Sequence, residues 1–338
     1  MRFTGENMVK IYHDADADLS VLDGKKIAVI GYGSQGRAQS LCLRDSGCDV
    51  VVGLRKTGAS WKKAEEDGIQ VAEIADAVKG ADIVMILLPD EVQGKIYKEQ
   101  IEPYLKPGVT LDLAHGFNII YKQVIPPEDA DVIMVAPKSP GKREREVFLQ
   151  GFGVPSLIAV EKDRSGKAKE TALAIAKGLG STKAGVLETT FHEETTSDLF
   201  GEQAVLCGGV TGLIVAGFET LVENGYQPEI AYFEVLHELK LIIDLVQAGG
   251  LMHMWNNVSN TAEYGGLSQR GTIIDERVKA NMQKMLDRIV SGEFSKEWME
   301  DWKTGLKRMR ALEKEESERQ IEKVGAELRS LFEMGPSE

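Results

Sequence analysis

Gly31-Tyr32-Gly33-Ser34-Gln35-Gly36 stands directly after the apolar run Lys26–Ile30 and opens a polar, helix-period segment at residues 35–45. In such a strand–turn–helix unit the first glycine makes the tight turn, the second lets the backbone approach a pyrophosphate, and the third allows close helix packing. Backbone N–H groups at the helix start then face the phosphates. The stretch predicts a dinucleotide site formed by these six residues; a glycine turn without a ligand is the alternative.

Short runs rich in Val, Ile and Leu recur after this turn, at residues 50–54, 83–88, 109–113 and 132–136, with another possible strand at 156–160. Helix-period segments at residues 61–67 and 73–79 lie between them. Continuous apolar runs are typical of strands that are buried on both faces of a parallel sheet. The first half of the chain therefore predicts an α/β fold, a Rossmann-type, doubly wound parallel sheet.

The pattern changes after about Thr182, because residues 191–332 contain long helical stretches and almost no strand-like alternation. With 338 residues, the chain is long enough for two domains. We expect an α/β domain at residues 1–182 and an all-α domain at residues 183–338. Residues 203–218 predict a buried helix, too short to span a membrane. Residues 301–332 predict one charged surface or oligomer helix.

Composition excludes several classes of protein. The chain is 43% hydrophobic and 28% charged, which is typical of a globular protein. Its net charge of -13 disfavours nucleic acid and anionic lipid surfaces as partners, so we expect neither nucleic acid nor a membrane. Three cysteines in no pairing pattern and an N-terminus without an apolar signal segment predict a reducing cytoplasm.

The end of the second predicted strand indicates the coenzyme. A site for NAD usually carries an acidic residue there, but this chain has Arg55 and Lys56, followed by the hydroxyls of Thr57 and Ser60. Guanidinium groups match phosphate oxygens, so NADPH is favoured and NADH remains possible; an exposed basic loop is the alternative. Further along, the segment containing Leu88, Pro89, Asp90 and Gln93 follows a strand and is expected to line the cofactor crevice.

The helical half carries two pairs of acidic residues at i, i+4 spacing, Asp198 with Glu202 and Glu234 with Glu238. Each pair projects from one helix face, where like charges are mildly destabilising unless a cation compensates them. Oxygen ligands suit Mg²⁺, and two such helices could hold two ions. Solvated helix faces are the alternative, and Glu193 and Glu194 offer the same chemistry. The apolar neighbours of both pairs favour a metal site, because buried charge must be paired or coordinated.

Two further candidates follow strands at the edge where the nicotinamide should lie. His115 could titrate or donate a hydrogen bond, and Lys138 could stabilise an anionic oxygen. For either residue alone a structural role is the more common one. Their shared position beside a dinucleotide motif makes catalysis equally reasonable.

Together these residues resemble one known family, the ketol-acid reductoisomerases, also called acetohydroxyacid isomeroreductases. The resemblance covers nearly the whole chain and rests on several motifs in the right order. They are Asp16-Ala17-Asp18-Leu19-Ser20, the glycine turn, Gly53-Leu54-Arg55-Lys56, Leu88-Pro89-Asp90-Glu91, Ala114-His115-Gly116-Phe117-Asn118, Ala136-Pro137-Lys138, Thr196-Ser197-Asp198-Leu199-Phe200-Gly201-Glu202-Gln203, Ala231-Tyr232-Phe233-Glu234, Leu236-His237-Glu238-Leu239-Lys240 and Ser259-Asn260-Thr261-Ala262-Glu263-Tyr264-Gly265. The length is similar to that of the short class, which has one knotted helical domain.

The resemblance implies an enzyme that isomerises 2-acetolactate or 2-aceto-2-hydroxybutyrate by alkyl migration and then reduces the product with NADPH to a 2,3-dihydroxy acid. It implies that the four carboxylates hold two Mg²⁺ ions, that Ser259 contacts the substrate carboxylate, and that His115 and Lys138 are catalytic. For Glu238 our hypothesis adds a role in proton transfer. Family members are homodimers, some assembling further, in which the partner chain supplies the later carboxylates and the serine.

Two segments depart from the family pattern. After Lys138 the family usually continues Gly-Pro-Gly-His, a hydrophobic residue and Val-Arg, whereas this chain has Ser139-Pro140-Gly141 followed by Lys142-Arg143-Glu144-Arg145. This change affects the expected cofactor contact at Gly141. The second departure is milder: Arg37-Ala38-Gln39 stands where His-Ala-His is common.

Two other functions fit the same layout. A 3-hydroxyacid dehydrogenase also pairs a Rossmann domain with a helical one, but it works without metal. A non-catalytic NADPH-binding regulator is the alternative outside the enzymes, although the four carboxylates speak against it.

Overall fold

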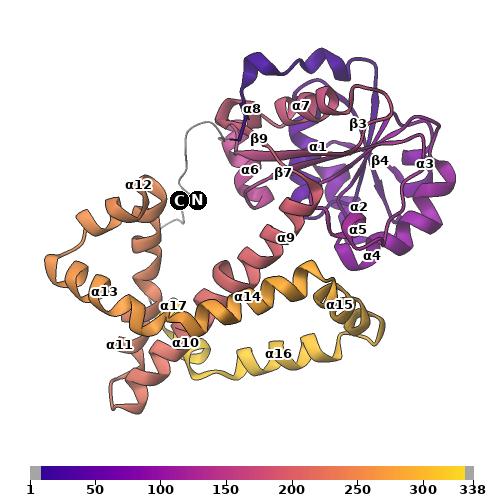
Figure 1. Cartoon of the computed structure of the whole chain (residues 1–338). Coiled ribbons are helices and arrows are strands. Elements are labelled where there is room, and N and C mark those ends of the chain that lie inside the picture. Colours follow the sequence, from indigo (N-terminus) through magenta and orange to yellow (C-terminus); the bar gives the residue numbers. More distant parts are fainter. Residues whose placement is uncertain (1–8, 332–338) are drawn as a thin grey trace. The chain divides into compact units, whose positions relative to one another are not determined.

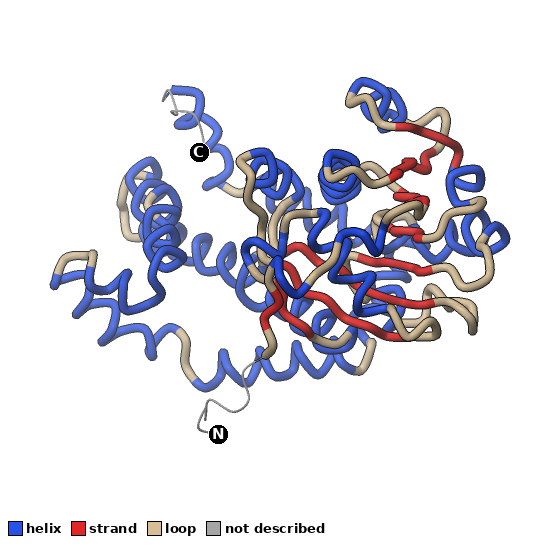
Figure 2. Tube along the Cα trace, turned by 90° about the horizontal axis from the view of Figure 1, so that it is seen from above, coloured by secondary structure: helices blue, strands red, loops and turns tan. Residues whose placement is uncertain are grey.

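The computed structural model describes residues 9–331 and divides them into two compact units, with the division after Ser197. The first unit contains one twisted sheet with helices around it (Figures 1 and 2). The sheet has nine strands in the order β1-β9-β8-β7-β6-β5-β2-β3-β4. The strands are β1 (Ile11–Tyr12), β2 (Lys26–Ile30), β3 (Asp49–Leu54), β4 (Gln70–Glu73), β5 (Ile83–Ile86), β6 (Thr110–Leu113), β7 (Asp131–Pro137), β8 (Ser156–Lys162) and β9 (Val186–Glu188).

Six of these strands, from β4 through β3, β2, β5 and β6 to β7, pair in parallel. The chain leaves β2 for β3 on one side and returns to β5 on the other, so the order reverses beside β2, where an open α/β sheet binds its ligand. The predicted Rossmann-type sheet is confirmed. The six strands that the sequence predicted are also present, as β2, β3, β5, β6, β7 and β8.

Helices cover both faces of this sheet. They are α1 (Ser34–Asp45), α2 (Ala59–Glu66), α3 (Ile74–Val78), α4 (Asp90–Ile96), α5 (Phe117–Ile120), α6 (Gly141–Leu149), α7 (Ala168–Gly178) and α8 (Ser181–Ala184). On one face α1 and α7 pack against Val29, Met85 and Ile133. On the other, α3 packs against Ala28 and Val84. Because alternate residues of each strand enter different cores, both faces must be apolar, as the continuous runs indicated.

The described part of the second unit contains helices and no strand, which confirms the all-α prediction. Its helices are α9 (Phe191–Gly201, which crosses the division), α10 (Gly208–Glu223), α11 (Pro228–Tyr232), α12 (Leu239–Asn256), α13 (Asn260–Ile273), α14 (Glu276–Val290), α15 (Glu293–Lys303), α16 (Lys307–Glu318) and α17 (Gln320–Leu331). Two π-helical turns, Glu202–Leu206 and Phe233–His237, interrupt them. A small core forms around Phe218, Tyr232 and Ile321.

The prediction of one helix over residues 301–332 is wrong. Three helices, α15, α16 and α17, occupy the described part of this range; Phe332 lies outside it. The first break is at Gly305 and Leu306, which both adopt positive φ angles of 89° and 60°. The second is at Arg319, whose backbone is extended. The sequence pattern indicated neither break, because the charged residues and the apolar stripe continue through the whole range from residue 301 to residue 332.

The prediction that residues 203–218 form a buried helix is also wrong within the single chain. Half of these residues are exposed, including Leu206 at 69% and Leu213 at 54%, whereas Phe218 packs into the small core. By length and composition alone, the helical run Phe191–Glu223 could cross a membrane, with a mean hydropathy of 1.8 in its most apolar window. Apolar sequence predicts that a surface is covered, but it does not say which molecule covers it.

Candidate active site

A cavity of about 720 Å³ opens at the carboxyl ends of β2, β3 and β5, entirely within the first unit. Segments far apart in the sequence line it: the glycine turn, the loop after β3, the loop after β5, and the loop after β6. The predicted site residues among the lining are Gly31, Tyr32, Gly33, Ser34, Gln35, Arg55, Ser60, Leu88, Pro89, Asp90, Gln93 and His115. One cavity therefore joins most of the predicted cofactor residues.

The second and third glycines of the turn have different surroundings. A Cβ atom on Gly36 would lie 2.3 Å from the Gly31 carbonyl oxygen, so a side chain is excluded by the protein itself. A Cβ on Gly33 would have no heavy atom within 4 Å, and its φ of -77° suits any residue. The space beside Gly33 is thus open where a pyrophosphate would pass, which fits a dinucleotide.

Gly33→Ala is expected to raise the Kd for NADPH more than about tenfold without changing stability, because its methyl group enters only the coenzyme's space. Fluorescence titration with NADPH and thermal unfolding measure the two quantities. Gly36→Ala is the matched comparison: its clash is with backbone, so it should lower the free energy of unfolding by about 1–3 kcal/mol. Normal NADPH binding by Gly33→Ala would contradict the assignment of the cavity.

The loop between β3 and α2 contributes Arg55 to the cavity, and the first turn of α2 contributes Ser60; Lys56 is exposed and is not among the lining residues. Gly58, the N-cap of α2, and Ala59, its first residue, also line the cavity. Arg55 and the helix start thus fit a phosphate group, whereas the role of Lys56 stays a prediction.

Buried polar contacts fix the loop after β5. Gln93 Nε2 donates to the Leu88 carbonyl at 2.6 Å, and Asn118 Nδ2 donates to Asp90 Oδ1 at 2.9 Å. Burial raises the pKa of Asp90 to about 6. These two hydrogen bonds fix the side chains of Gln93 and Asp90 in the wall of the cavity.

His115 and Lys138 are brought together by a residue that the sequence reasoning treated only as an alternative metal ligand. Glu194, on α9, is 1% exposed. Its Oε2 lies 3.0 Å from His115 Nδ1, and its Oε1 accepts a hydrogen bond from Lys138 Nζ at 2.7 Å. Burial acts to raise the pKa of Glu194, but His115 and Lys138 hold it below its ordinary value. Nothing in a separation of 79 residues indicated this contact.

Gly141 lies against the glycine turn despite the altered residues that follow it. Its N–H donates to Ser34 Oγ at 3.1 Å, and Gln35 Nε2 donates to the Ser139 carbonyl at 2.8 Å. Lys142 and Arg143 are exposed, so their charges are solvated. Glu144, where the family usually has valine, is 1% exposed, and neither carboxyl oxygen has a hydrogen-bond partner within residues 9–331.

Burial raises the pKa of Glu144 to about 8. The folded chain therefore keeps a proton that the unfolded chain releases above its ordinary pKa of 4.5. The free energy of unfolding should therefore fall as the pH rises from 4.5 to about 8, and it should level off at higher pH. Glu144→Leu should remove about 1.4 kcal/mol of that loss per pH unit.

Chemical denaturation at pH 5.5, 7 and 8.5, at one protein concentration, measures this difference. Glu146→Gln is the control, because Glu146 lies two residues away on α6 and is 44% exposed. Equal pH slopes for Glu144→Leu and the natural chain would show that Glu144 titrates normally.

The four predicted metal ligands lie in or beside the two π-helical turns of the second unit. Asp198 lies in the last turn of α9, four residues before Glu202, which begins the first π turn; Glu234 lies in the second π turn, and Glu238 follows it directly. π-Helical turns are rare in proteins as a whole, and those that occur are often found at functional sites. Four carboxylates are the kind of ligand set that fits Mg²⁺. Ser259 is the N-cap of α13 and accepts from the Ala262 N–H at 3.2 Å.

Comparison with known proteins decides the family. The family model "acetohydroxy acid isomeroreductase, NADPH-binding domain" matches residues 21–185, and "ketol-acid reductoisomerase, C-terminal domain" matches residues 191–334. The chain belongs to the ketol-acid reductoisomerase family. The resemblance seen in the sequence is thereby confirmed, as is its enzyme class.

Individual family members match almost end to end. The ketol-acid reductoisomerase (NADP(+)) of Methanocaldococcus jannaschii is 56% identical over 96% of this chain and 98% of its own length. The one from Pyrobaculum arsenaticum is 57% identical over 96% and 99%. A solved NADH-preferring ketol-acid reductoisomerase from an uncultured archaeon is 52% identical, covers 96% of this chain and 100% of its own, and superposes with a TM-score of 0.93.

Proposed function

We propose that this chain converts 2-acetolactate and 2-aceto-2-hydroxybutyrate to 2,3-dihydroxy acids in the synthesis of valine, leucine and isoleucine. The first step is an alkyl migration, and the second is a reduction by NADPH. When bound, two Mg²⁺ ions would polarise the ketone and lower the pKa of the neighbouring alcohol, and NADPH would supply the hydride. The family match over both halves of the chain is the observation that carries this proposal.

The proposed roles follow from the chemistry of each side chain. Asp198, Glu202, Glu234 and Glu238 hold the metal ions, and Ser259 binds the substrate carboxylate. His115 and Lys138, fixed by Glu194, orient the substrate oxygens and hold the protons there. Glu238 assists proton transfer as well. Gly141 and the residues around the cavity, including Arg55, Lys56 and Ser60, bind the coenzyme.

Absorbance of the reduced nicotinamide tests the function directly. The chain is mixed with 2-acetolactate and either NADPH or NADH, with Mg²⁺ present or chelated. We expect oxidation of NADPH that requires Mg²⁺, with slower oxidation of NADH. Failure to oxidise either coenzyme under any of these conditions would defeat the proposal.

The same assay separates the two other functions. A 3-hydroxyacid dehydrogenase would keep its activity after thorough EDTA treatment and would accept a 3-hydroxy acid in the reverse direction. A regulator would bind NADPH without turnover. All three cysteines are free in the structure, which supports the cytoplasm as the compartment in each case.

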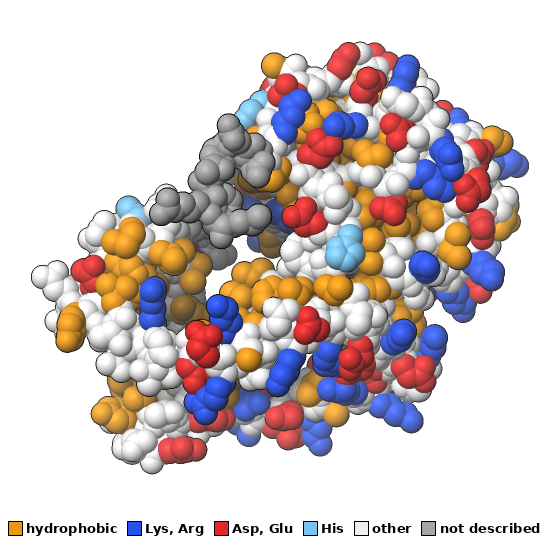
Figure 3. All heavy atoms as spheres, viewed as in Figure 1, with side chains coloured by type: hydrophobic (Ala, Val, Ile, Leu, Met, Phe, Trp, Pro, Cys, Tyr) orange, Lys and Arg blue, Asp and Glu red, His pale blue; other side chains and the backbone are white. Residues whose placement is uncertain are grey.

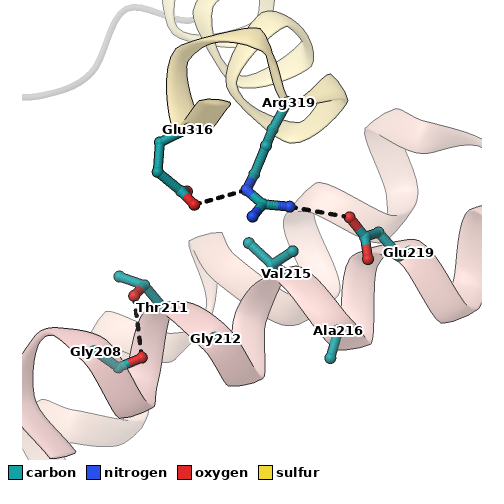
Figure 4. Close-up of a pocket in the computed structure, with 8 residues that line it drawn as sticks. All are labelled: Gly208, Thr211, Gly212, Val215, Ala216, Glu219, Glu316 and Arg319. Atoms are coloured by element: carbon teal, nitrogen blue, oxygen red, sulfur yellow. Dashed lines mark hydrogen bonds and ion pairs between the residues drawn. The ribbon is translucent and has the colours of Figure 1, made fainter. Parts of the chain in front are cut away.

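We also propose that the active enzyme is a homodimer or a larger assembly with active sites shared between knotted helical domains. Hydrophobic side chains gather on the exposed surface over α12 (Figure 3), among them Leu241, Leu251 and Met252, each at least 60% exposed. On α10 the small residues Gly208, Gly212 and Ala216 line a groove of about 410 Å³ (Figure 4). A helix of a second copy, with its apolar face, fits such surfaces.

Light scattering after gel filtration measures the assembly. We expect at least twice the mass of one chain, and Gly212→Leu, which fills the groove, should shift the mass toward a monomer. A natural chain that elutes as a monomer, or that partitions into vesicles instead, would contradict a dimer.

A further inference from the structure

Three side chains from separate segments meet at the C-terminal end of α2: Tyr32 of the glycine turn, Arg37 of α1 and Asp67. The Tyr32 hydroxyl donates to Asp67 Oδ2 at 2.9 Å. Arg37 Nε donates to the same oxygen at 2.6 Å, and Nη2 donates to Oδ1 at 2.7 Å. A two-bonded guanidinium–carboxylate pair fixes direction as well as distance. We call this cluster the Tyr32–Asp67–Arg37 clasp.

Helix α2 has few other attachments. Ala64 is its one buried residue, and Trp61 packs only partly against the core. Its Lys62–Glu66 ion pair is exposed on both sides, which makes it weak. A second tie lies at the same end as the clasp, because Arg44 Nη1 donates to the Asp67 carbonyl at 2.7 Å. The orientation of α2 is therefore set largely at its C-terminal end.

The opposite end of α2 faces the coenzyme cavity. Gly58, Ala59 and Ser60 line that cavity together with Arg55. A helix of this length is a rigid rod of about 12 Å, so a rotation at the clasp displaces the residues at the cavity. Tyr32 also lines the cavity and is 4% exposed. Because Tyr32 belongs to the glycine turn, its hydrogen bond to Asp67 fixes the turn to the same end of α2.

We propose that the Tyr32–Asp67–Arg37 clasp positions the coenzyme site: it fixes the spacing between the glycine turn and the start of α2, and so contributes to the preference for NADPH over NADH. Both coenzymes need the glycine turn for their pyrophosphate, but only NADPH needs Arg55 and the start of α2 for a 2′-phosphate. The inference rests on the coenzyme site of the proposed function.

The charge state of the clasp supports a lasting anchor. The hydrogen bonds from Arg37 and Tyr32 keep the pKa of Asp67 below its ordinary value, although burial opposes them. Asp67 also raises the pKa of Arg37. The pair stays ionised at every pH at which a dehydrogenase is assayed.

Binding measurements on full-length variants test the clasp. Arg37→Met removes the ion pair with Asp67, and Tyr32→Phe removes the hydrogen bond from the tyrosine hydroxyl. Lys62→Met, on α2, is the control. Calorimetry gives the Kd for NADPH, NADH, 2′,5′-ADP and 5′-AMP; the last two carry no nicotinamide and differ only in the 2′-phosphate. Arg37→Met should raise the Kd for NADPH and 2′,5′-ADP about tenfold and that for NADH and 5′-AMP less than about threefold. Tyr32→Phe should act in the same direction, and Lys62→Met should change nothing.

Further readouts separate positioning from general damage. The double variant should be less than additive, because both residues act through Asp67. Arg37→Lys, which keeps the charge but not the two-bonded geometry, should be intermediate. Equal weakening of both coenzymes, unchanged binding, or a natural chain without preference for NADPH would overturn the inference. A natural chain that prefers NADPH but does not consume 2-acetolactate would refute the proposed function and leave the clasp intact.

Discussion

Glu202→Gln is expected to lower kcat with 2-acetolactate about a thousandfold at saturating Mg²⁺, while the Kd for NADPH stays the same. An amide keeps the shape of the carboxylate but lacks the charge that holds a divalent ion. The metal contribution to alkyl migration is several kcal/mol, and about 1.4 kcal/mol corresponds to a factor of ten in rate. Glu234→Gln should behave alike, because we assign it to the same pair of ions.

The control for this prediction is Glu223→Gln. Glu223 forms an i, i+4 acidic pair with Glu219 at the end of α10 and is exposed, so it represents an ordinary solvated pair. Its activity should equal that of the natural chain. If Glu202→Gln and Glu223→Gln were equally active, the carboxylates at the π-helical turns would not be metal ligands.

Glu194→Gln is expected to lower kcat about a hundredfold, with a smaller change in the KM for NADPH. The substitution removes the buried anion that Lys138 and His115 share, at 2.7 Å and 3.0 Å. Both side chains then lose the partner that fixes their orientation, and positioned acid–base groups typically contribute a factor of about 10²–10⁴. Steady-state kinetics with Mg²⁺ held constant measures the change.

Glu193→Gln is the matched control, because the neighbouring side chain is exposed and contacts only Thr189 in the described chain. Thermal unfolding of Glu194→Gln tells loss of orientation from loss of fold. Full activity in a folded Glu194→Gln variant would mean that His115 and Lys138 work independently of Glu194.

The central strands were predictable because each is buried on both faces, and the apolar run is then nearly the strand itself, as at Lys26–Ile30. The strands β1, β4 and β9 were missed. Each has four residues or fewer and lies at or next to an edge of the sheet, where exposed positions such as Gln70 and Glu73 break up the apolar signal. Edge strands are defined by their partner more than by their own sequence.

The site was predictable where chemistry sits in a local motif, as in the glycine turn and at Arg55. Glu194 was not, because its role depends on His115 and Lys138, which follow two different strands. Tyr32 and Asp67 illustrate the same limit: a tyrosine inside the turn is visible in the sequence, but its bond to a helix end is not.

The pairing of β1 with β9 has a consequence for synthesis. Tyr12 donates to Glu188, 176 residues later, and the backbones of the two strands pair beside this bond. As the ribosome works from the N-terminus, the first strand emerges early and waits unpartnered until the last strand of its sheet has been made. In a nascent chain that is stalled before Val186, a protease should therefore cleave near Ile11 and Tyr12. In a longer chain that includes β9 and α9 and has left the ribosome, the two residues should be protected.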